Sequence, residues 1–196
     1  SGLTQRTGSG SVSYAVSANA SSTARDTTLS IAGRGFAVHQ DGVLCTYALT
    51  PASATATVAG GTQTVKVTTP APDCRWTNTS SHDWLAITSG TERQGTQNIT
   101  VTVASNATSS RPRTGTITVT GATGTTPAVF TLAQAATPCT IVVPTSVTAP
   151  AAGGTVVIDV AVSPGDCGWA GSAGVARLTF AAGEDAGAGA RRPEGG

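Results

Sequence analysis

The fold is decided by the stretch Cys74-Arg75-Trp76-Thr77-Asn78-Thr79-Ser80-Ser81-His82-Asp83-Trp84-Leu85-Ala86-Ile87. On both sides of it the chain consists of short segments rich in Thr, Val and Ala, which are separated by Gly-rich turns. Apolar and polar residues alternate in these segments, as in Val12-Ser13-Tyr14-Ala15-Val16, and this period of two is typical of half-buried strands. No segment of useful length has a helical period, so the sequence predicts an all-β protein.

Composition narrows the class of protein. Charged residues make up 11% of the 196 residues and the net charge is +1, so the clustered basic charge that nucleic-acid binding needs is absent. Aromatic residues make up only 4%, and a thin two-sheet sandwich suits such a core better than a large α/β enzyme does. No run of 18 apolar residues occurs, so we expect no membrane insertion.

The cysteines point to a compartment. Cys45 and Cys74 are 29 residues apart and Cys139 and Cys167 are 28 apart, and no C-x-x-C or nearby histidine suggests a zinc site. Two disulfides, Cys45–Cys74 and Cys139–Cys167, are the simplest interpretation, with four buried free thiols as the alternative. Disulfides would place the protein in an oxidising space, either secreted or at the cell surface.

Internal repeats organise the chain. The segment from Cys45 recurs from Cys139, and Gly60-Gly61-Thr62 recurs as Gly153-Gly154-Thr155. Further equivalent segments are listed here: Asp73-Cys74-Arg75-Trp76 with Asp166-Cys167-Gly168-Trp169, Val12 to Asn19 with Ile99 to Asn106, Arg25 to Ile31 with Arg113 to Val119, and Phe36 to Gln40 with Phe130 to Gln134. The chain is therefore predicted to hold tandem immunoglobulin-like β-sandwich repeats, one complete and two partial.

The repeats predict four regions. Residues 1–42 form the back half of a repeat, 43–135 a complete sandwich, 136–180 the front half of a repeat, and 181–196 a disordered Gly/Ala-rich tail. In the complete repeat, strands are predicted near residues 45–50, 55–59, 63–69, 74–78, 84–87, 97–103, 114–120 and 128–134. In the partial repeats, strands are predicted around 12–16, 29–31, 36–38, 156–160 and 175–180, with a hairpin turn at Arg34-Gly35.

An ordered set of motifs resembles the BACON domain. The set comprises Cys74-Arg75-Trp76, Trp84-Leu85-Ala86-Ile87, Gly95, Ile99 to Asn106, Arg113-Thr114-Gly115-Thr116-Ile117-Thr118-Val119 and Phe130 to Gln134. The resemblance implies an immunoglobulin/fibronectin-III-like sandwich in a secreted or surface protein of bacteria or phage, often beside glycoside hydrolases or peptidases. Carbohydrate binding was proposed for the family, but no universal binding residues go with it.

The polar loop between the two tryptophans is the first candidate for ligand contact. Trp76, His82 and Asp83 are the candidate ligand-binding residues, since flat aromatic faces fit sugar rings. The alternatives are that the tryptophans pack on the disulfide in the core and that the loop is merely solvated.

The sequence carries no recognisable active site. His39 and His82 fall in different repeats, and nucleophile, zinc-protease and phosphate-loop motifs are absent. We therefore expect no catalytic residue, no metal and no cofactor. Asp73 and Asp166 precede cysteines at equivalent places, where a turn or capping role suits their carboxylates.

Three functions are compatible with these features. The first is a non-catalytic extracellular module for adhesion, carbohydrate binding or domain spacing, with a surface glycan as partner. The second is a subunit of an extracellular filament, in which the terminal half-domains complement each other head to tail by self-association. The third is an accessory region of a secreted hydrolase.

Overall fold

The fold is described from a computed structural model, which covers residues 7–122, 124–175 and 177–180. Every regular element in these residues is a strand, so the predicted all-β class is confirmed. None of these residues belongs to a helix long and apolar enough to cross a lipid bilayer. The tail 181–196, which we expect to be disordered, lies outside the described residues.

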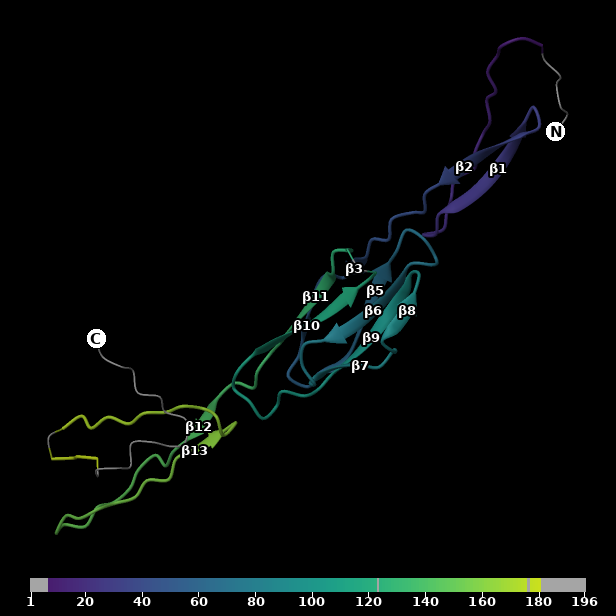
Figure 1. The fold of residues 1–196 in the computed structure, drawn as a ribbon. Helices are drawn as coiled ribbons and strands as arrows, with labels where there is room; N and C mark the ends of the chain where they lie inside the picture. Colours follow the sequence, from purple (N-terminus) through teal and green to yellow (C-terminus); the bar gives the residue numbers. More distant parts are fainter. Residues whose placement is uncertain (1–6, 123, 176, 181–196) are drawn as a thin grey trace.

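A β-sandwich occupies the middle of the chain (Figure 1). One sheet has five strands, in the order β4 (Ser53–Ala56), β11 (Ala128–Gln134), β10 (Arg113–Thr120), β6 (Arg75–Ser80) and β8 (Glu92–Gln94). The other sheet has four, in the order β3 (Ala48–Thr50), β5 (Gly61–Thr68), β9 (Gln97–Val103) and β7 (Leu85–Ile87). All eight predicted strands are present, 97–103 and 128–134 with the predicted bounds and the other six with shifted ends, and β8 was not predicted.

Alternation builds the core between the sheets. In β9, Ile99, Val101 and Val103 are buried while Asn98 and Thr102 face water. The strands of the other sheet follow the same rule and bury Trp76, Leu132, Ile117, Val119 and the fully enclosed ring of Phe130. Since successive side chains of a strand point to opposite faces, the period of two in the sequence becomes one dry layer.

Strands from the front and back of the sandwich sequence pair with one another. β5 pairs antiparallel with β9 over seven residue pairs, from Gly61↔Val103 to Val67↔Gln97. β6 pairs with β10 in the other sheet, and β4 pairs in parallel with β11. The front strands 48–80 therefore need the back strands 97–134 in order to be buried, and the reverse also holds.

Residues 25–40 form a separate two-stranded hairpin, β1 (Arg25–Ile31) with β2 (Arg34–Gln40). Its turn is Ala32-Gly33, with φ values of 53° and 75°. Two positive φ values define the type I′ turn that fits the right-handed twist of a hairpin. The predicted turn at Arg34-Gly35 is wrong, because those residues already pair with Ile31 and Ser30.

Three predicted strands are absent from the described residues. Residues 12–16 and 156–160 have no regular structure and no sheet pairing, and the described residues of 175–180 form no strand either. The regular structure near the C-terminus is the short pair β12 (Thr140–Val142) and β13 (Ala161–Ser163). A strand needs a neighbour for its backbone hydrogen bonds, and none of the described residues pairs with 12–16 or 156–160.

Both predicted disulfides are present. Cys45 is bonded to Cys74 and Cys139 to Cys167, and none of the four cysteines is free. Cys74 and Cys167 are both buried. The first disulfide ties the segment before β3 to the start of β6, and thereby links the two sheets of the sandwich.

We predict that the double substitution Cys45→Ala/Cys74→Ala lowers the free energy of unfolding of the sandwich by roughly 3–4 kcal/mol. The physical reason is that the 29-residue loop no longer restricts the unfolded chain. Urea denaturation followed by tryptophan fluorescence measures the change.

The matched control is Cys139→Ala/Cys167→Ala, which opens a loop of 28 residues outside the sandwich. This control should leave the main unfolding transition in place. An equal loss of stability in both variants would contradict the assignment of Cys45–Cys74 to the sandwich alone.

Candidate functional site

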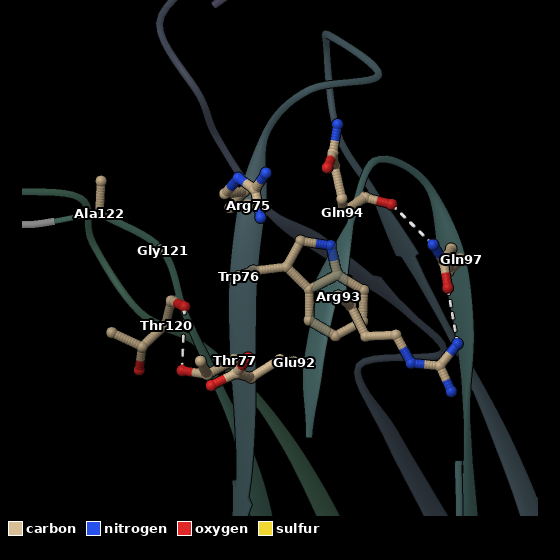
Figure 2. A pocket seen from close by; sticks show the side chains of 10 residues that line it. All are labelled: Arg75, Trp76, Thr77, Glu92, Arg93, Gln94, Gln97, Thr120, Gly121 and Ala122. Atoms are coloured by element: carbon tan, nitrogen blue, oxygen red, sulfur yellow. Dashed lines mark hydrogen bonds between the residues drawn. The ribbon is translucent and has the colours of Figure 1, made fainter. Parts of the chain in front are cut away.

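A shallow hollow of about 570 Å³ opens on the five-stranded sheet (Figure 2). Its walls come from β6, from β8, from the first residue of β9, and from the end of β10 with the residues that follow. The lining residues are Arg75, Trp76, Thr77, Glu92, Arg93, Gln94, Gln97, Thr120, Gly121 and Ala122. We refer to this hollow as the β6–β8 groove.

Strand register sets which side chains reach the groove. Arg75 lies opposite Gln94 and Thr77 opposite Glu92, and these four side chains are exposed on the outer face of the sheet. Trp76 lies between Arg75 and Thr77 and points inward, as alternation along a strand requires. The outer face therefore presents a cation, an anion, an amide and a hydroxyl side by side.

Part of the groove is held in place by hydrogen bonds. Arg93 Nη1 donates to Gln97 Oε1 at 2.6 Å, and Gln97 Nε2 donates to the backbone oxygen of Gln94 at 2.7 Å (Figure 2). Within the described residues, the side chains of Arg75 and Glu92 make no hydrogen bond or ion pair. Their five N–H donors and two carboxylate oxygens remain for water or a ligand.

Trp76 is a core residue with one edge on the groove. Its side chain is 2% exposed and its indole Nε1 donates to the backbone oxygen of Gly95 at 2.9 Å. The ring face is therefore covered by the sandwich interior, as the core interpretation of the sequence predicts, and the structure offers no open ring face here on which a sugar could stack.

His82 and Asp83 lie away from the groove, in the loop that follows the far end of β6. The His82 ring lies 5.8 Å from the Trp84 ring, and Ser81 Oγ is 2.7 Å from His82 Nδ1. The Arg113 guanidinium lies over the Trp84 ring at 4.3 Å, which is cation–π geometry. The three candidate ligand residues are therefore not brought together in one site.

Two places in the structure share another polar arrangement, in which an aspartate accepts hydrogen bonds from two consecutive serines that lie earlier in the chain. Ser21 Oγ donates to Asp73 Oδ2 at 2.5 Å, and the Ser22 amide donates to Asp73 Oδ1 at 2.9 Å. Asp73 lies just before β6 of the sandwich, whereas Ser21 and Ser22 lead into the β1–β2 hairpin. We refer to this contact as the first joint.

The second joint has the same chemistry. Ser109 Oγ donates to Asp166 Oδ2 at 2.9 Å, and the Ser110 amide donates to Asp166 Oδ1 at 2.8 Å. In each joint the first serine also accepts a hydrogen bond that closes a tight turn. The Thr23 amide donates to Ser21 Oγ, and the Arg111 amide donates to Ser109 Oγ. Each aspartate is followed directly by a disulfide cysteine, so its backbone is anchored.

These hydrogen bonds stabilise the charged form of both carboxylates. The Ser21 hydroxyl and the Ser22 amide lower the pKa of Asp73 from 3.8 to about 2. The Ser110 amide, followed by the Ser109 hydroxyl, lowers the pKa of Asp166 as well. Hydrogen bonds that donate to a carboxylate favour ionisation, so both joints are anionic at neutral pH.

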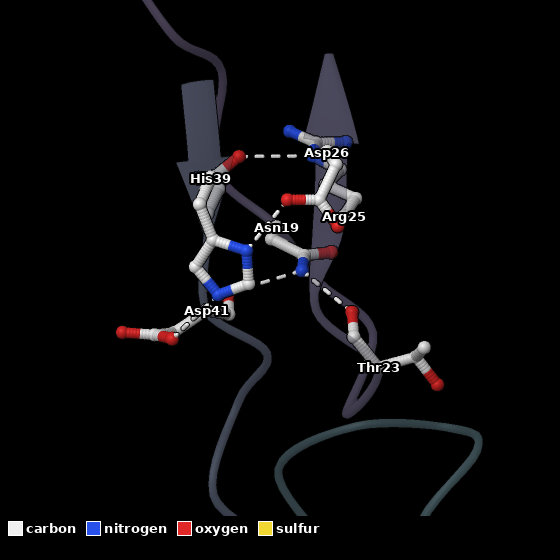
Figure 3. Close-up of polar contacts among 7 residues, drawn as sticks. Asn19, Thr23, Arg25, Asp26, His39 and Asp41 are labelled. Carbon is white, nitrogen blue, oxygen red and sulfur yellow. Dashed lines mark hydrogen bonds and ion pairs between the residues drawn. The ribbon is translucent and has the colours of Figure 1, made fainter. Parts of the chain in front are cut away.

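His39 forms a third polar group on the β1–β2 hairpin (Figure 3). Its Nδ1 lies 2.7 Å from Asp26 Oδ1 and its Nε2 lies 3.2 Å from Asp41 Oδ1. The hydrogen bond with Asp26 is the main reason that the pKa of His39 is raised above 6.5. Both ring nitrogens are occupied by carboxylates, so this exposed cluster ties β1 to β2 and leaves neither nitrogen free as a base.

The sequence singled out Trp76 of the groove and gave both joint aspartates a turn or capping role. It missed Arg75, Glu92 and Gln94, because these residues come together only through the pairing of β6 with β8. The three-residue strand β8 was not predicted from the sequence. The one available signal was alternation, since Arg75 and Thr77 flank an inward-pointing tryptophan. Among the described residues, no cluster of three or more His, Cys, Asp or Glu side chains could hold a metal ion.

Comparisons with known proteins show which family part of the chain resembles. The family model described as "BACON: Putative binding domain, N-terminal" matches residues 75–135, from β6 to the end of β11. No curated protein matches the chain.

Similar solved structures include part of a Bacteroides ovatus GH5 xyloglucanase in complex with a XXXG heptasaccharide. It is 24% identical with a TM-score of 0.41, over 47% of this chain and 19% of that one. Others are the Caenorhabditis elegans MSP family member WR4 and the C. elegans MSP-domain-like protein SSP-19. WR4 is 12% identical with a TM-score of 0.32, over 46% of this chain and 96% of that one. SSP-19 is 16% identical with a TM-score of 0.32, over 45% of this chain and 97% of that one.

The present chain thus spans about a fifth of the length of the xyloglucanase. The matched segment 75–135 carries five of the motifs quoted from the sequence, and it supplies six strands of the central sandwich. The chain therefore contains a BACON domain.

Proposed function

We propose that this protein is a non-catalytic extracellular module in which sandwich repeats are linked at defined angles, so that it spaces or presents a binding surface. The observation that carries the proposal is the occurrence of two equivalent joints, Asp73 on Ser21-Ser22 and Asp166 on Ser109-Ser110. A chance contact between neighbouring segments would not recur with the same atoms.

The chemistry of the joints suits a fixed linkage. Each carboxylate receives a hydroxyl and an amide from the preceding unit, and hydrogen bonds to an ionised acceptor are about twice as strong as neutral ones. A backbone hydrogen bond accompanies each joint, from Val43 to Ser21 and from Thr137 to Ser109. Such a linkage holds successive units in one relative orientation, whereas a free linker would let them turn.

The compartment supports this role. Two disulfides indicate an oxidising environment outside the cytosol, where small β domains commonly depend on such crosslinks. Adhesion, and the spacing of a secreted hydrolase domain, both require a unit that keeps its length under these conditions.

Carbohydrate binding in the β6–β8 groove is the second candidate function. The groove is favoured because Arg75 and Glu92 lie exposed beside Gln94 and Thr77. The side chains of Arg75 and Glu92 form no hydrogen bond with any described residue. Sugar hydroxyls both donate and accept hydrogen bonds, so a mixed set of this kind could bind several of them. The candidates Trp76, His82 and Asp83 remain part of this proposal, Trp76 as the floor of the groove and the other two as a separate loop.

We predict that acidification loosens the joints. The pKa of Asp73 is about 2 in the folded protein and 3.8 ordinarily, so the contribution of this joint is complete above pH 3.8. It is lost as the pH falls through about 2, when the carboxylate is protonated. Small-angle X-ray scattering should then report a broader range of interdomain distances, while tryptophan fluorescence checks that the sandwich stays folded.

The variant Asp73→Asn/Asp166→Asn should be as loose at pH 7 as the wild type is in acid, because the amide carries no charge. Asp83→Asn, in a loop without a joint, is the matched control. Scattering curves for the double variant that equal those of wild type at pH 7 would contradict the joint model.

We predict that the variant Arg75→Ala/Glu92→Ala loses affinity for carbohydrate at least tenfold, as expected when two charged hydrogen-bonding groups are removed. A panel of neutral polysaccharides first identifies a ligand of the wild type, and calorimetry then compares the variant. Arg34→Ala, an exposed substitution on β2, is the control. Absence of any polysaccharide ligand, or equal binding by the variant, would remove the groove from consideration.

A further inference from the structure

His39 contacts two carboxylates at once on the β1–β2 hairpin (Figure 3). Its Nδ1 lies 2.7 Å from Asp26 Oδ1, and its Nε2 lies 3.2 Å from Asp41 Oδ1. A neutral imidazole carries a single N–H, whereas an imidazolium carries two. Because an ionised carboxylate only accepts hydrogen bonds, both contacts are hydrogen bonds only when the ring of His39 is protonated.

The pair of Asp26 and His39 lies on the outer face of the hairpin. Asp26 on β1 pairs directly with His39 on β2, as Thr114 pairs with Ala133 in the sandwich. Thr114 and Ala133 are both exposed there. The exposure of His39 is therefore the normal condition of this position in a complete repeat.

Asp26 and Asp41 are the charged side chains that contact His39 within the described residues. Arg25 precedes Asp26 on β1 but points to the opposite face, where its Nε donates to Gln40 Oε1 at 2.9 Å. The hydrogen bond and the charge of Asp26, followed by the hydrogen bond with Asp41, raise the pKa of His39 above 6.5. Both contacts are therefore present in mildly acidic solution, below pH 6.5, and one of them is lost as the pH rises through this raised pKa.

A continuous line of hydrogen bonds leads from His39 to the first joint. The side chain of Asp41 takes the contact from Nε2, and the backbone oxygen of Asp41 accepts a hydrogen bond from Asn19 Nδ2 at 3.1 Å. Asn19 Oδ1 accepts from the Ser21 amide at 3.3 Å, and Ser21 Oγ donates to Asp73 Oδ2. The His39 ring is thereby connected with the carboxylate that links the hairpin to the sandwich.

The second joint has an equivalent amide contact without an ionisable end. Asn106 Nδ2 donates to the backbone oxygen of Ala135 at 3.0 Å, as Asn19 Nδ2 does to that of Asp41. The repeat places Thr114, Ala133 and Ala135 where the first unit has Asp26, His39 and Asp41. All three ionisable groups are therefore replaced together at the second joint, which supplies an internal control.

We infer that the first joint carries a switch that is operated by the protonation of His39. With the ring protonated, Asp41 is held against the hairpin and orients the serines of the joint through Asn19. When the ring loses a proton, the shorter contact with Asp26 keeps the remaining N–H, and the bare Nε2 faces a carboxylate that it cannot bind. Asp41 is then released and the first joint loosens, while the second joint is unaffected. This inference rests on the proposed function of the joints and adds the regulation of one of them.

The switch acts in a pH range different from that of the joint carboxylate. Asp73 is protonated only near pH 2, whereas His39 loses its proton above pH 6.5. The first joint is therefore tightest in mildly acidic solution and loosens on both sides of that range.

The test is an NMR titration of the whole chain from about pH 5 to about pH 9, which brackets the titration of histidine. The Ser22 amide donates to Asp73 and the Ser110 amide donates to Asp166, so their hydrogen-exchange rates report the two joints separately. The general effect of pH on exchange is common to both amides and cancels in the ratio of the two rates. We expect the Ser22-to-Ser110 ratio to rise about two- to fivefold, as for the loss of an exposed ion pair, with the same midpoint as the His39 ring signals.

Two substitutions should act in opposite directions. Asp41→Ala removes the contact with Nε2, so the ratio should be high and independent of pH. Asp26→Asn removes the competitor for the remaining proton, because an amide can donate to Nδ1 and leave the N–H of the neutral ring at Nε2 for Asp41. In that variant the ratio should stay low at every pH. Asp83→Asn, in a loop without a joint, is the matched control and should behave as the wild type.

Two results would overturn the inference: a Ser22-to-Ser110 ratio that does not follow the His39 ring, or a high ratio in both Asp26→Asn and Asp41→Ala. The second result would mean that the cluster is merely structural. The wild-type titration needs no substitution, so it is decisive even where a variant fails to fold. Failure of the proposed joints looks different, since the Ser22 and Ser110 amides would then exchange as in an unfolded chain at every pH.

Discussion

The pairing of β5 with β9 is the constraint on which the rest of the structure depends. It joins the front and back strands of the sandwich over seven residue pairs and buries Val65 against Ile99. Strand sequence alone is not enough, because Val12 to Val16 and Val156 to Ile158 have the same alternation but form no strand. Backbone groups satisfied across the two halves, together with one shared apolar layer, decide where a strand exists.

The two joints connect the sandwich to its neighbouring units through a few hydrogen bonds and not through a large buried interface. Asp73 precedes β6, and Asp166 takes the corresponding sequence position before Cys167-Gly168-Trp169, which form no strand. The adjacent disulfides hold the backbone that carries each carboxylate. Asp73-Cys74-Arg75-Trp76 therefore supplies a link to the preceding unit, a crosslink and an aromatic core residue, whereas Trp169 of the second copy is only part buried.

Much of the fold could be predicted from the sequence because alternation and cysteine spacing are local signals. They identified the sandwich strands, the pairing of Cys45 with Cys74 and the interior place of Trp76. The groove could not be predicted, since Arg75 meets Gln94 only through the register of β6 with a three-residue strand. The strands predicted at 12–16 and 156–160 are wrong for the converse reason, because alternation in the sequence does not show whether a neighbouring strand pairs with them.

The same physics connects the two kinds of surface on this protein. The groove lies on the outer face of a sheet whose inner face is already filled, so its polar side chains can serve a soluble ligand without loss of the core. The exposed residues Phe36 and Ile158 correspond by repeat alignment to Phe130 and Val65, which are buried on the inner faces of the sandwich. Water is a good partner for the first surface and a poor one for the second.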